Sequence, residues 1–438
     1  MANFEERFWA PDPTLDTGVG IPRRDRRGGT YFAYRPDLLC GRSFFLGGPE
    51  AADVADAERG IIALDYSSTT LADTEALARL LLRAESVASS HIEGLEIGPS
   101  RLLRADAARS QGDEPKDDVA AEVLANIDAM TFAIREITSN PIVTRELLLE
   151  THRRLLAPTR IAEHGGHFRT RQNWIGGSDY NPLSAVFVPP PPDLVPGLMD
   201  DLIVFCNEDS LPTVAQAAIA HAQFETIHPF ADGNGRIGRV LIHLIFRRRR
   251  LTSVVSPPVS LILATRARDY VAGLTATRYD GPANSPQAYE GLNRWMGTFA
   301  AACTRAAADA SAFEKRIAAI QSAWRERLGN VRSHSAVLRI IEILPGTPLT
   351  TVSSLQRMTG SALSSITEAV GRLEKAEILR SVTLGRKRGQ VYEAREIMDA
   401  FTDFERQLAS PADDTHLEPP ARTVPRRPQA VRRPARGR

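Results

Sequence analysis

Apolar residues recur at spacings of three and four positions along most of the chain from Leu71 to Ala308, which is the pattern of helices that bury one face. The clearest stretches are LADTEALARLLLRAESVASSHIE, DDVAAEVLANIDAMTFAIREI, TRELLLETHRRLL, PTVAQAAIAHAQFETI and GRIGRVLIHLIFRRRR. Between them, residues 171–191 change to a short pattern around Gly, Asn and Pro that predicts two strands joined by a turn. The predicted fold class is mainly α, with one β-hairpin set into a helical core.

A second compact unit, residues 335–408, is predicted to follow the helical core. SAVLRIIEIL predicts a helix, PLTTVSSLQRMTG follows it, and SALSSITEAVGRLEKAEIL predicts a recognition helix with Leu363, Ile366, Val370 and Leu373 facing inward. SVTLGRKRGQVYEA predicts two strands around a basic turn, the wing of the unit. This order of elements indicates a small winged helix-turn-helix domain.

The two ends of the chain lack apolar periodicity. The N-terminal end is rich in Pro, Gly and Arg, and the C-terminal end in Pro and Arg, which predicts a disordered tail there. The predicted organisation is an irregular N-terminal wrap at 1–65, a helical core at 66–310 that includes a helix at 71–94 and the hairpin at 171–191, a helical linker at 311–334, the winged unit at 335–408 and the tail at 409–438.

Composition excludes several classes of protein. No apolar run reaches the roughly 20 residues that a bilayer span requires, and the first residues, MANFEERFWAPDP, lack the features of a secretory signal. Cys40, Cys206 and Cys303 lie far apart without a CxxC pair, which argues against a disulfide framework or a thiolate zinc site. With a net charge of +1, the chain as a whole is no polyanion binder. We therefore expect a cytoplasmic protein with no membrane partner.

The stretch TIHPFADGNGRIGR, residues 226–239, combines residue types that an ordinary core does not need. The preceding apolar pattern predicts a helix that ends at His228. Gly233–Gly235 form a turn, and a new helix is expected to begin near Arg236. A glycine-rich turn that leads into a helix is an anion site, because backbone N–H groups and the helix dipole point at one spot.

The side chains around this turn supply the other requirements of a phosphate-ester transfer. Asp232 is a candidate ligand for Mg²⁺, the ion that accompanies phosphates. Arg236 and Arg239 share one side of the first helical turn, where they can reach phosphate oxygens. His228 can take a proton from an incoming nucleophile. Each residue alone is compatible with a helix end or a charged surface, and it is their conjunction that favours the functional interpretation.

HPFADGNGRIGR matches, without a departure, the HPFx(D/E)GNGRxxR signature of the Fic family of nucleotidyl transferases, and the resemblance covers about residues 65 to 310. The resemblance implies an all-helical core with a β-hairpin flap over the site. It also implies transfer of AMP from ATP to a hydroxyl side chain of a target protein, with His228 as the general base and Asp232 as the Mg²⁺ ligand. The residues that it assigns to the nucleotide phosphates are Gly233, Asn234, Gly235, Arg236 and Arg239.

The family's flap corresponds to the predicted hairpin at 171–191. The resemblance implies that this flap holds the target's backbone as an added strand and so brings a Ser, Thr or Tyr hydroxyl near His228. The residues expected to do so are Asn173, Trp174, Ile175 and Gly176. Without the family context, the segment is more typical of an ordinary surface hairpin.

A second short motif bears on regulation. In RAESVASSHIEGLEIG, Ser89 and Glu93 lie one helical turn apart, and Gly94 is a helix stop. The spacing by itself is typical of a solvated helix end. SSHIEG nevertheless resembles the (S/T)xxxE(G/N) inhibitory motif of Fic proteins. In that motif the glutamate pairs with the second arginine of the signature, here Arg239, and competes with the γ-phosphate for the same guanidinium donors.

Two classes of function stay open. One is an autoinhibited protein AMP-transferase that acts on a hydroxyl-bearing target protein and on itself. The other is a DNA-binding regulator whose core only senses nucleotide. The intact His228 favours the enzyme, since a sensor needs no proton acceptor. Other donors (UTP, CDP-choline), removal of AMP and homodimerisation are not excluded by the motif.

The winged unit has a candidate surface for DNA. The basic residues that would contact phosphates are Arg372, Arg380, Arg386, Lys387 and Arg388. Acidic residues on the same unit dilute this charge, namely Glu368, Glu374 and Glu377. Winged helices also bind proteins, so the sequence leaves the choice between DNA and a protein partner open.

Overall fold

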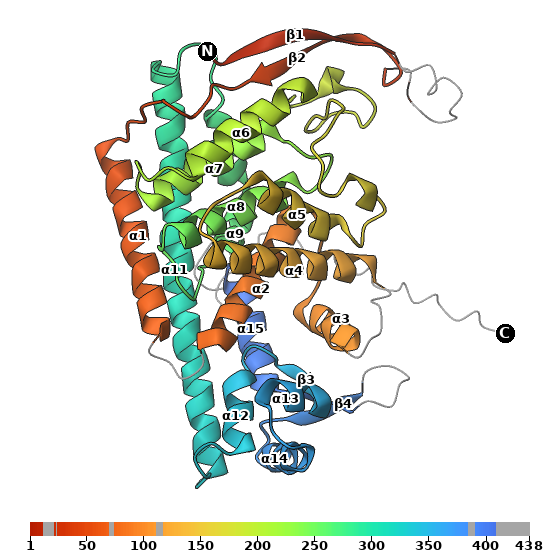
Figure 1. Cartoon of the computed structure of the whole chain (residues 1–438), viewed down its shortest axis with the longest axis vertical. Helices are drawn as coiled ribbons and strands as arrows, with labels where there is room; N and C mark the ends of the chain where they lie inside the picture. The colour runs from red at the N-terminus through yellow and green to blue at the C-terminus, as the bar shows by residue number, and fades with distance from the viewer. Residues whose placement is uncertain (12–21, 23, 70–73, 111–116, 384–389, 409–438) are drawn as a thin grey trace, which may run out of the picture.

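The computed structural model describes residues 1–11, 22, 24–69, 74–110, 117–383 and 390–408 (Figure 1). The tail that the sequence predicts to be disordered, 409–438, lies outside the described residues, as do Arg386, Lys387 and Arg388 of the predicted wing. Within the described part, helices dominate and the sheets are small, as the sequence predicts. No helix of this described part is long and apolar enough to cross a bilayer.

The helical core spans the first eleven helices. They are α1 (Gly48–Thr69), α2 (Thr74–Ile92), α3 (Pro99–Ser110), α4 (Asp118–Ser139), α5 (Arg145–Leu156), α6 (Val195–Cys206), α7 (Thr213–Ile227), α8 (Asn234–Arg248), α9 (Val259–Thr265), α10 (Ala267–Ala276) and α11 (Pro286–Leu328). Single 3-10 turns lie between α5 and α6, namely η2 (Ala162–His164), η3 (Pro182–Ser184) and η4 (Pro192–Leu194).

Two helices that are buried on all sides form the centre of the core. Every residue of α7 is buried, and so is every residue of α8 from Asn234 to Phe246. They pack against each other, α4 contacts α8, and α11 contacts both α7 and α1. Figure 1 shows α11 running along almost the whole length of the molecule, with α1 beside it. The loop between α7 and α8 is therefore held between two fully packed helix ends.

The N-terminal segment is not irregular, so that prediction is wrong. Strands β1 (Asn3–Trp9) and β2 (Gly29–Arg35) form an antiparallel hairpin, and α1 follows. In α1 the buried apolar residues keep the helical spacing but form a narrow stripe, namely Val54, Ala57, Ile61 and Leu64. The hairpin exposes Phe8 and Phe32. Both features hide the apolar periodicity that identifies such elements in a sequence.

The predicted hairpin at 171–191 has no regular strands. It is held by one antiparallel bridge between Ile175 and Phe187, and η3 interrupts its far side. The run of prolines at 189–192 explains the difference, because proline has no N–H to donate to a strand ladder. The segment is instead continued by β2, whose Tyr34 N–H donates to the Val188 carbonyl at 2.9 Å. We keep the name flap for residues 171–191.

The C-terminal unit is not joined to the core by a separate linker. α11 is one helix of 43 residues that includes most of the predicted linker at 311–334. After it come α12 (Ala336–Ile343), β3 (Leu349–Thr351), α13 (Val352–Thr359), α14 (Leu363–Lys375), β4 (Arg380–Thr383), β5 (Gln390–Glu393) and α15 (Arg395–Leu408), with the antiparallel sheet order β3-β5-β4.

Within α14, three of the four residues predicted to face inward are buried: Ile366, Val370 and Leu373. Leu363 is 54% exposed, so its predicted inward position is wrong. It is the first residue of the helix, one turn before the stripe makes contact with α12 and α13.

Candidate active site

His228 closes α7 in a strained backbone conformation. Its φ of 50° is in the left-handed region, and its N–H donates to the Phe224 carbonyl at 2.8 Å. A non-glycine residue pays roughly 1 to 2 kcal/mol for this conformation, so the surroundings must enforce it. They do so at the His228 carbonyl, which accepts from Arg169 Nε at 2.8 Å and from Asn173 Nδ2 at 3.3 Å.

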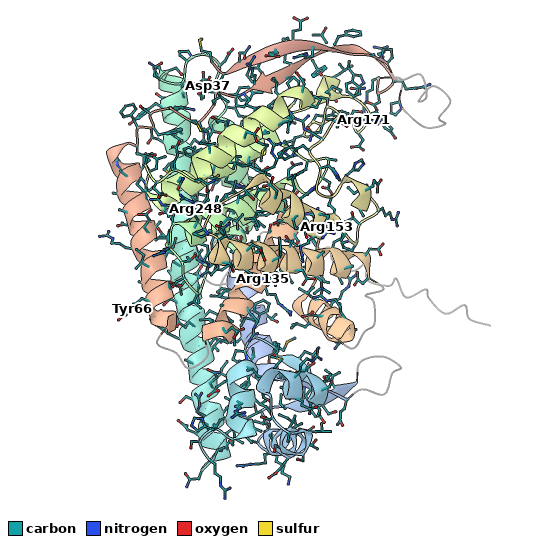
Figure 2. All side chains as sticks on the ribbon, viewed as in Figure 1. Asp37, Tyr66, Arg135, Arg153, Arg171 and Arg248 are labelled. Atoms are coloured by element: carbon teal, nitrogen blue, oxygen red, sulfur yellow. The ribbon has the colours of Figure 1, made fainter. Side chains whose placement is uncertain are left out.

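Arg169 is a buried brace between the flap and the α7–α8 loop. Besides His228, its guanidinium donates to the carbonyls of Pro190 (2.5 Å), Ile227 (3.3 Å) and Arg171 (3.2 Å). Figure 2 labels Arg171, where the flap begins. The sequence analysis missed Arg169, because an isolated arginine in a polar segment carries no sign of the four carbonyls that it will contact.

The loop between the helices is fixed by two further side chains. Asn234 accepts from the Phe230 N–H at 2.8 Å and donates to the Phe230 carbonyl at 2.9 Å. His152 of α5 accepts from the Gly166 N–H at 3.0 Å through Nδ1, so its proton lies on Nε2, which donates to the Asp232 carbonyl at 3.0 Å. The Asn234 side chain thus closes the loop and does not point at a ligand, while His152 is a supporting residue that the sequence analysis missed.

The N-terminus of α8 lies where the sequence predicts an anion site. Gly233 has a φ of 76°, and a side chain there would clash with Leu155. α8 begins at Asn234, two residues before the predicted start. A side chain at Gly235 would overlap the carboxylate of Glu93. Glu93 therefore lies directly over the first turn of α8, where backbone N–H groups attract anions.

Arg239 binds the helix end that carries Glu93. Its Nε donates to Ser89 Oγ at 2.9 Å, and its Nη2 donates to the Ser89 carbonyl at 2.8 Å and to Glu93 Oε1 at 2.7 Å. The predicted pairing of Glu93 with Arg239 is confirmed. Gly94 follows with a φ of 83° and leads the chain away. Only 1% of the Arg239 side chain is exposed, so these contacts occupy a buried guanidinium.

Electrostatics keep this pair ionised. Burial alone would raise the pKa of Glu93, but the charge and the hydrogen bond of Arg239 outweigh it and hold the pKa below the ordinary value. Burial likewise opposes the charge of Arg239, and Glu93 more than compensates, so the pKa of Arg239 is raised. The contact is a charge-assisted pair, the stronger class of hydrogen bond.

α2 is anchored to the core well beyond its motif. Glu85 of α2 is buried, accepts from the Ser260 N–H at 2.8 Å and lies 2.9 Å from His243 Nε2 of α8. Asn126 of α4 donates to the carbonyl of Ser86 at 2.8 Å. These residues were not singled out in the sequence, since a glutamate in an amphipathic helix is ordinarily a surface residue. The anchors hold the helix against α8 and α9 from Glu85 onward.

Arg236 keeps donors free for a ligand. Its side chain is 3% exposed, and its Nη2 lies 3.4 Å from Asp232 Oδ2. Among the described residues, its Nε and Nη1 have no hydrogen-bond partner, although Nη1 is 3.9 Å from Glu122. A buried guanidinium with unpaired donors beside a helix N-terminus fits a phosphate group.

Asp232 fits one part of a Mg²⁺ site. One of its carboxylate oxygens accepts from the Gly233 N–H at 2.6 Å, and 49% of the side chain is exposed at the mouth of the anion site. No group of three His, Cys, Asp or Glu that could hold a metal occurs in the described part of the chain. A single carboxylate suits Mg²⁺ that is shared with substrate phosphates, because this ion keeps water and phosphate oxygens as its other ligands.

The flap residues divide between two roles. Asn173 also donates to the Phe230 carbonyl at 3.1 Å, so it supports the loop. Trp174 donates to the Ser178 carbonyl at 2.6 Å and stacks edge-on against Trp9 of β1. Ile175 is bridged to Phe187, and Gly176 turns the chain with a φ of 71°. The structure brings Asn173 to the site, while Trp174 faces the N-terminal hairpin.

The site thus consists of a histidine at the end of one buried helix and two arginines on the first turn of the next. Residues 142–246 match the family model of the Fic/DOC family, and residues 51–135 match that of the Fic/DOC family N-terminal region. Both matches lie within the helical core, so this part of the chain is similar to the Fic/DOC family. The N-terminal match includes α2, which carries Glu85 and Ser89.

Similar proteins share parts of this chain. Protein adenylyltransferase fic-1 of Caenorhabditis elegans is 36% identical over 128 residues, 28% of this chain and 22% of that protein. Protein adenylyltransferase Fic of Drosophila virilis is 31% identical over 218 residues, 47% of this chain and 43% of that protein. The chain thus spans less than half the length of these relatives.

The fold is shared with a solved structure. A Fic family protein from Desulfovibrio desulfuricans G20 aligns with a TM-score of 0.50 over 80% of this chain and 97% of that chain, at 20% identity. At this identity the likeness concerns the arrangement of the helices.

Proposed function

We propose that the chain transfers AMP from ATP to a Ser, Thr or Tyr hydroxyl of a target protein and of itself, and that its resting form is inhibited by Glu93. The observation that carries this proposal is the position of the Glu93 carboxylate, which lies over the N-terminus of α8 and on Arg239. An anion occupies the place where a nucleotide phosphate would bind. The names of the two relatives, both protein adenylyltransferases, support the same activity.

His228 is proposed as the proton acceptor. Burial lowers its pKa to about 4, so the imidazole is neutral at pH 7 and can take a proton. As the hydroxyl oxygen of the target bonds to the α-phosphorus of ATP, its proton passes to His228, and the bond from the α-phosphorus to pyrophosphate breaks. Arg169 Nε donates to the His228 carbonyl and so holds the left-handed backbone that carries this ring.

The phosphates are proposed to bind along the first turn of α8. The backbone N–H groups after Gly233 and the unpaired donors of Arg236 both belong to this turn. Arg239 would add its guanidinium once Glu93 leaves it. Mg²⁺ bound by Asp232 and the phosphates would neutralise part of the triphosphate charge. These residues would position the phosphates and stabilise the negative charge that develops on them in the transition state.

Labelled nucleotides test the proposal. The Glu93→Gly protein is incubated separately with α-labelled ATP, UTP and CDP-choline in the presence of Mg²⁺, and the modified residues are identified by mass spectrometry. We expect AMP on a hydroxyl side chain. Transfer of another group assigns a different donor, and loss of AMP from a premodified protein assigns the reverse reaction. No transfer from any donor at any protein residue refutes the proposed function.

The C-terminal unit is proposed to be a winged helix-turn-helix, on the basis of its element order from α12 to β5. Residues 335–408 contain ten Lys and Arg and nine Asp and Glu, so their charge is close to balanced. Arg380 is already paired with Glu393 at 2.8 Å. This balance favours a protein partner over DNA. Binding of the full chain to a pool of random duplexes, with affinity that falls steeply with salt, would restore the DNA interpretation and the regulator alternative. Homodimerisation and a cytoplasmic location stay predictions.

A further inference from the structure

Glu225 is a buried carboxylate that no motif accounts for. It lies on α7, three residues before His228, and is 7% exposed. Charged groups are rarely buried without a partner, because desolvation costs several kcal/mol. Glu225 Oε1 nevertheless has no hydrogen-bond partner among the described residues.

The nearest basic atom to Glu225 is on His228. Glu225 Oε2 lies 3.9 Å from His228 Nδ1, which is buried and has no hydrogen-bond partner within the described part of the chain. The unpaired Nδ1 thus lies near a carboxylate whose other oxygen, Oε1, is also unpaired, across a gap slightly longer than a hydrogen bond. Catalytic hydrogen bonds are often long in a resting enzyme and shorten when the substrate binds.

The left-handed turn at His228 creates this arrangement. In a continuing helix, residues i and i+3 lie on the same face, and the turn brings the imidazole back over the last turn of α7. Gly238 of α8 makes the room, since a side chain there would lie 2.6 Å from Glu225 Oε1. The absence of a side chain at Gly238 thus leaves space between α7 and α8 for the Glu225 carboxylate.

We propose that Glu225 is a positioning residue for His228: it accepts a hydrogen bond from Nδ1–H and so leaves Nε2 as the unprotonated acceptor that faces the target hydroxyl. During transfer, Nε2 takes the proton, and the carboxylate stabilises the imidazolium without taking up a proton itself. This inference rests on the proposed function, because it gives His228 its orientation for that reaction. His228 is partly exposed while its Nδ1 is buried, so the open part of the ring is not Nδ1.

The surroundings of Glu225 set its ionisation. Burial raises its pKa to about 7, the charge of Arg239 opposes the rise, and Glu93 adds to it. The charged and titratable groups that face it come from every element packed around it: His221 and His228 of α7, Arg239 of α8, Glu93 after α2, Tyr270 of α10 and Arg278 after α10. Removal of Glu93 therefore favours the ionised carboxylate that positions His228.

The pH dependence follows from these directions. His228 is neutral above about pH 4, and Glu225 becomes charged as the pH rises through about 7. The kcat of the Glu93→Gly enzyme should rise with pH along two limbs, one for the deprotonation of His228 and one for that of Glu225. The Glu225 limb lies below pH 7 in that enzyme, since the charge of Glu93 no longer raises it.

The test compares Glu225→Gln with Glu225→Asp, each in the Glu93→Gly enzyme. Glu225→Gln keeps the shape and removes the charge, and we expect kcat to fall on the order of tenfold to a hundredfold with the KM for ATP unchanged. The limb of the pH profile that belongs to Glu225 should disappear. Glu225→Asp should keep that limb at a reduced kcat. Glu314→Gln, another buried carboxylate that loses its charge, is the matched control and should leave the profile unchanged.

A second measurement needs no catalysis. The ring ¹⁵N resonances of His228, assigned by comparison with His228→Ala, report its tautomer without ATP. We expect the Nδ1–H tautomer in the parent and a mixture of tautomers in Glu225→Gln. An unchanged ring spectrum together with an unchanged pH profile overturns the positioning role. If the Glu93→Gly parent transfers nothing, the proposed function fails, while the ring spectrum still decides the role of Glu225.

Discussion

Replacing Glu93 by glycine should convert a nearly silent protein into an active transferase. The substitution removes the carboxylate that holds Arg239 Nη2 at 2.7 Å and uncovers the first turn of α8. Glu93 follows the last residue of α2, so a glycine there does not interrupt the helix. Arg239 then becomes available to the γ-phosphate.

The size of the effect follows from the bond that is lost. A hydrogen bond to a charged group contributes about 1.5 to 3 kcal/mol. Since about 1.4 kcal/mol corresponds to a factor of ten, the rate should increase roughly tenfold to a hundredfold. Ser89→Ala should give a smaller gain in rate, because it removes one hydrogen bond from Arg239 to an uncharged hydroxyl and leaves the competing Glu93 carboxylate in place.

The assay is the initial rate of AMP incorporation into the protein itself at fixed ATP and Mg²⁺. Glu96→Gly is the matched control: it removes an exposed carboxylate three residues further along the same loop and should leave the rate unchanged. Adding Arg239→Ala to Glu93→Gly should abolish the gain. If Glu93→Gly is folded, binds ATP and is no faster than the wild type, the reasoning on autoinhibition is refuted.

Three further predictions concern the supports of the site. His228→Ala in the Glu93→Gly enzyme should abolish transfer and leave ATP binding near normal, as measured by calorimetry; transfer at the parent rate would eliminate the proposed base. Arg169→Met should lower the free energy of unfolding by about 3 kcal/mol or more, because it leaves several carbonyls of the flap and the α7–α8 loop without a donor. Urea denaturation measures this, with Arg171→Met as the exposed control. Equal losses of unfolding free energy in the two variants would contradict the bracing role of Arg169. Burial lowers the pKa of His152 from its ordinary 6.5 to about 4. Between pH 6.5 and 5 the unfolded chain therefore takes up a proton that the folded chain does not. The free energy of unfolding should fall by about 2 kcal/mol over this range because of His152. His152→Gln should show a shallower decline, and an unchanged slope would count against the assignment.

The α7–α8 loop could be predicted because its requirements are local, whereas its contact with Glu93, 146 residues away from Arg239, could be predicted only from the resemblance of SSHIEG to the Fic inhibitory motif. A base, a glycine turn and two arginines three residues apart must share one helix end, and the spacing of Ser89 and Glu93 places both on one face. The partners that hold the site could not be read in the same way. Arg169 and His152 bind main-chain carbonyls of the α7–α8 loop, 59 and 80 residues away along the chain, and main-chain acceptors leave no mark in a sequence.

The elements that were missed share another property. α1 buries a stripe of mostly small and aliphatic residues, and the exposed Phe8 and Phe32 of the hairpin break the alternation that marks a half-buried strand. In the flap, the prolines limit pairing to the bridge at Ile175. Periodicity identifies an element only when one face is clearly apolar and the other is not.

The helix α11 joins the C-terminal unit to the helical core without a break. At about 1.5 Å per residue, its 43 residues form a rod of roughly 65 Å. At one end, Trp324 is fully buried and donates to Glu396 of α15 at 2.6 Å. At the other end, Trp295 donates to the Ala218 carbonyl of α7 at 2.8 Å, on the helix that ends at His228. The C-terminal unit is therefore joined through one uninterrupted helix to the helix that ends at His228.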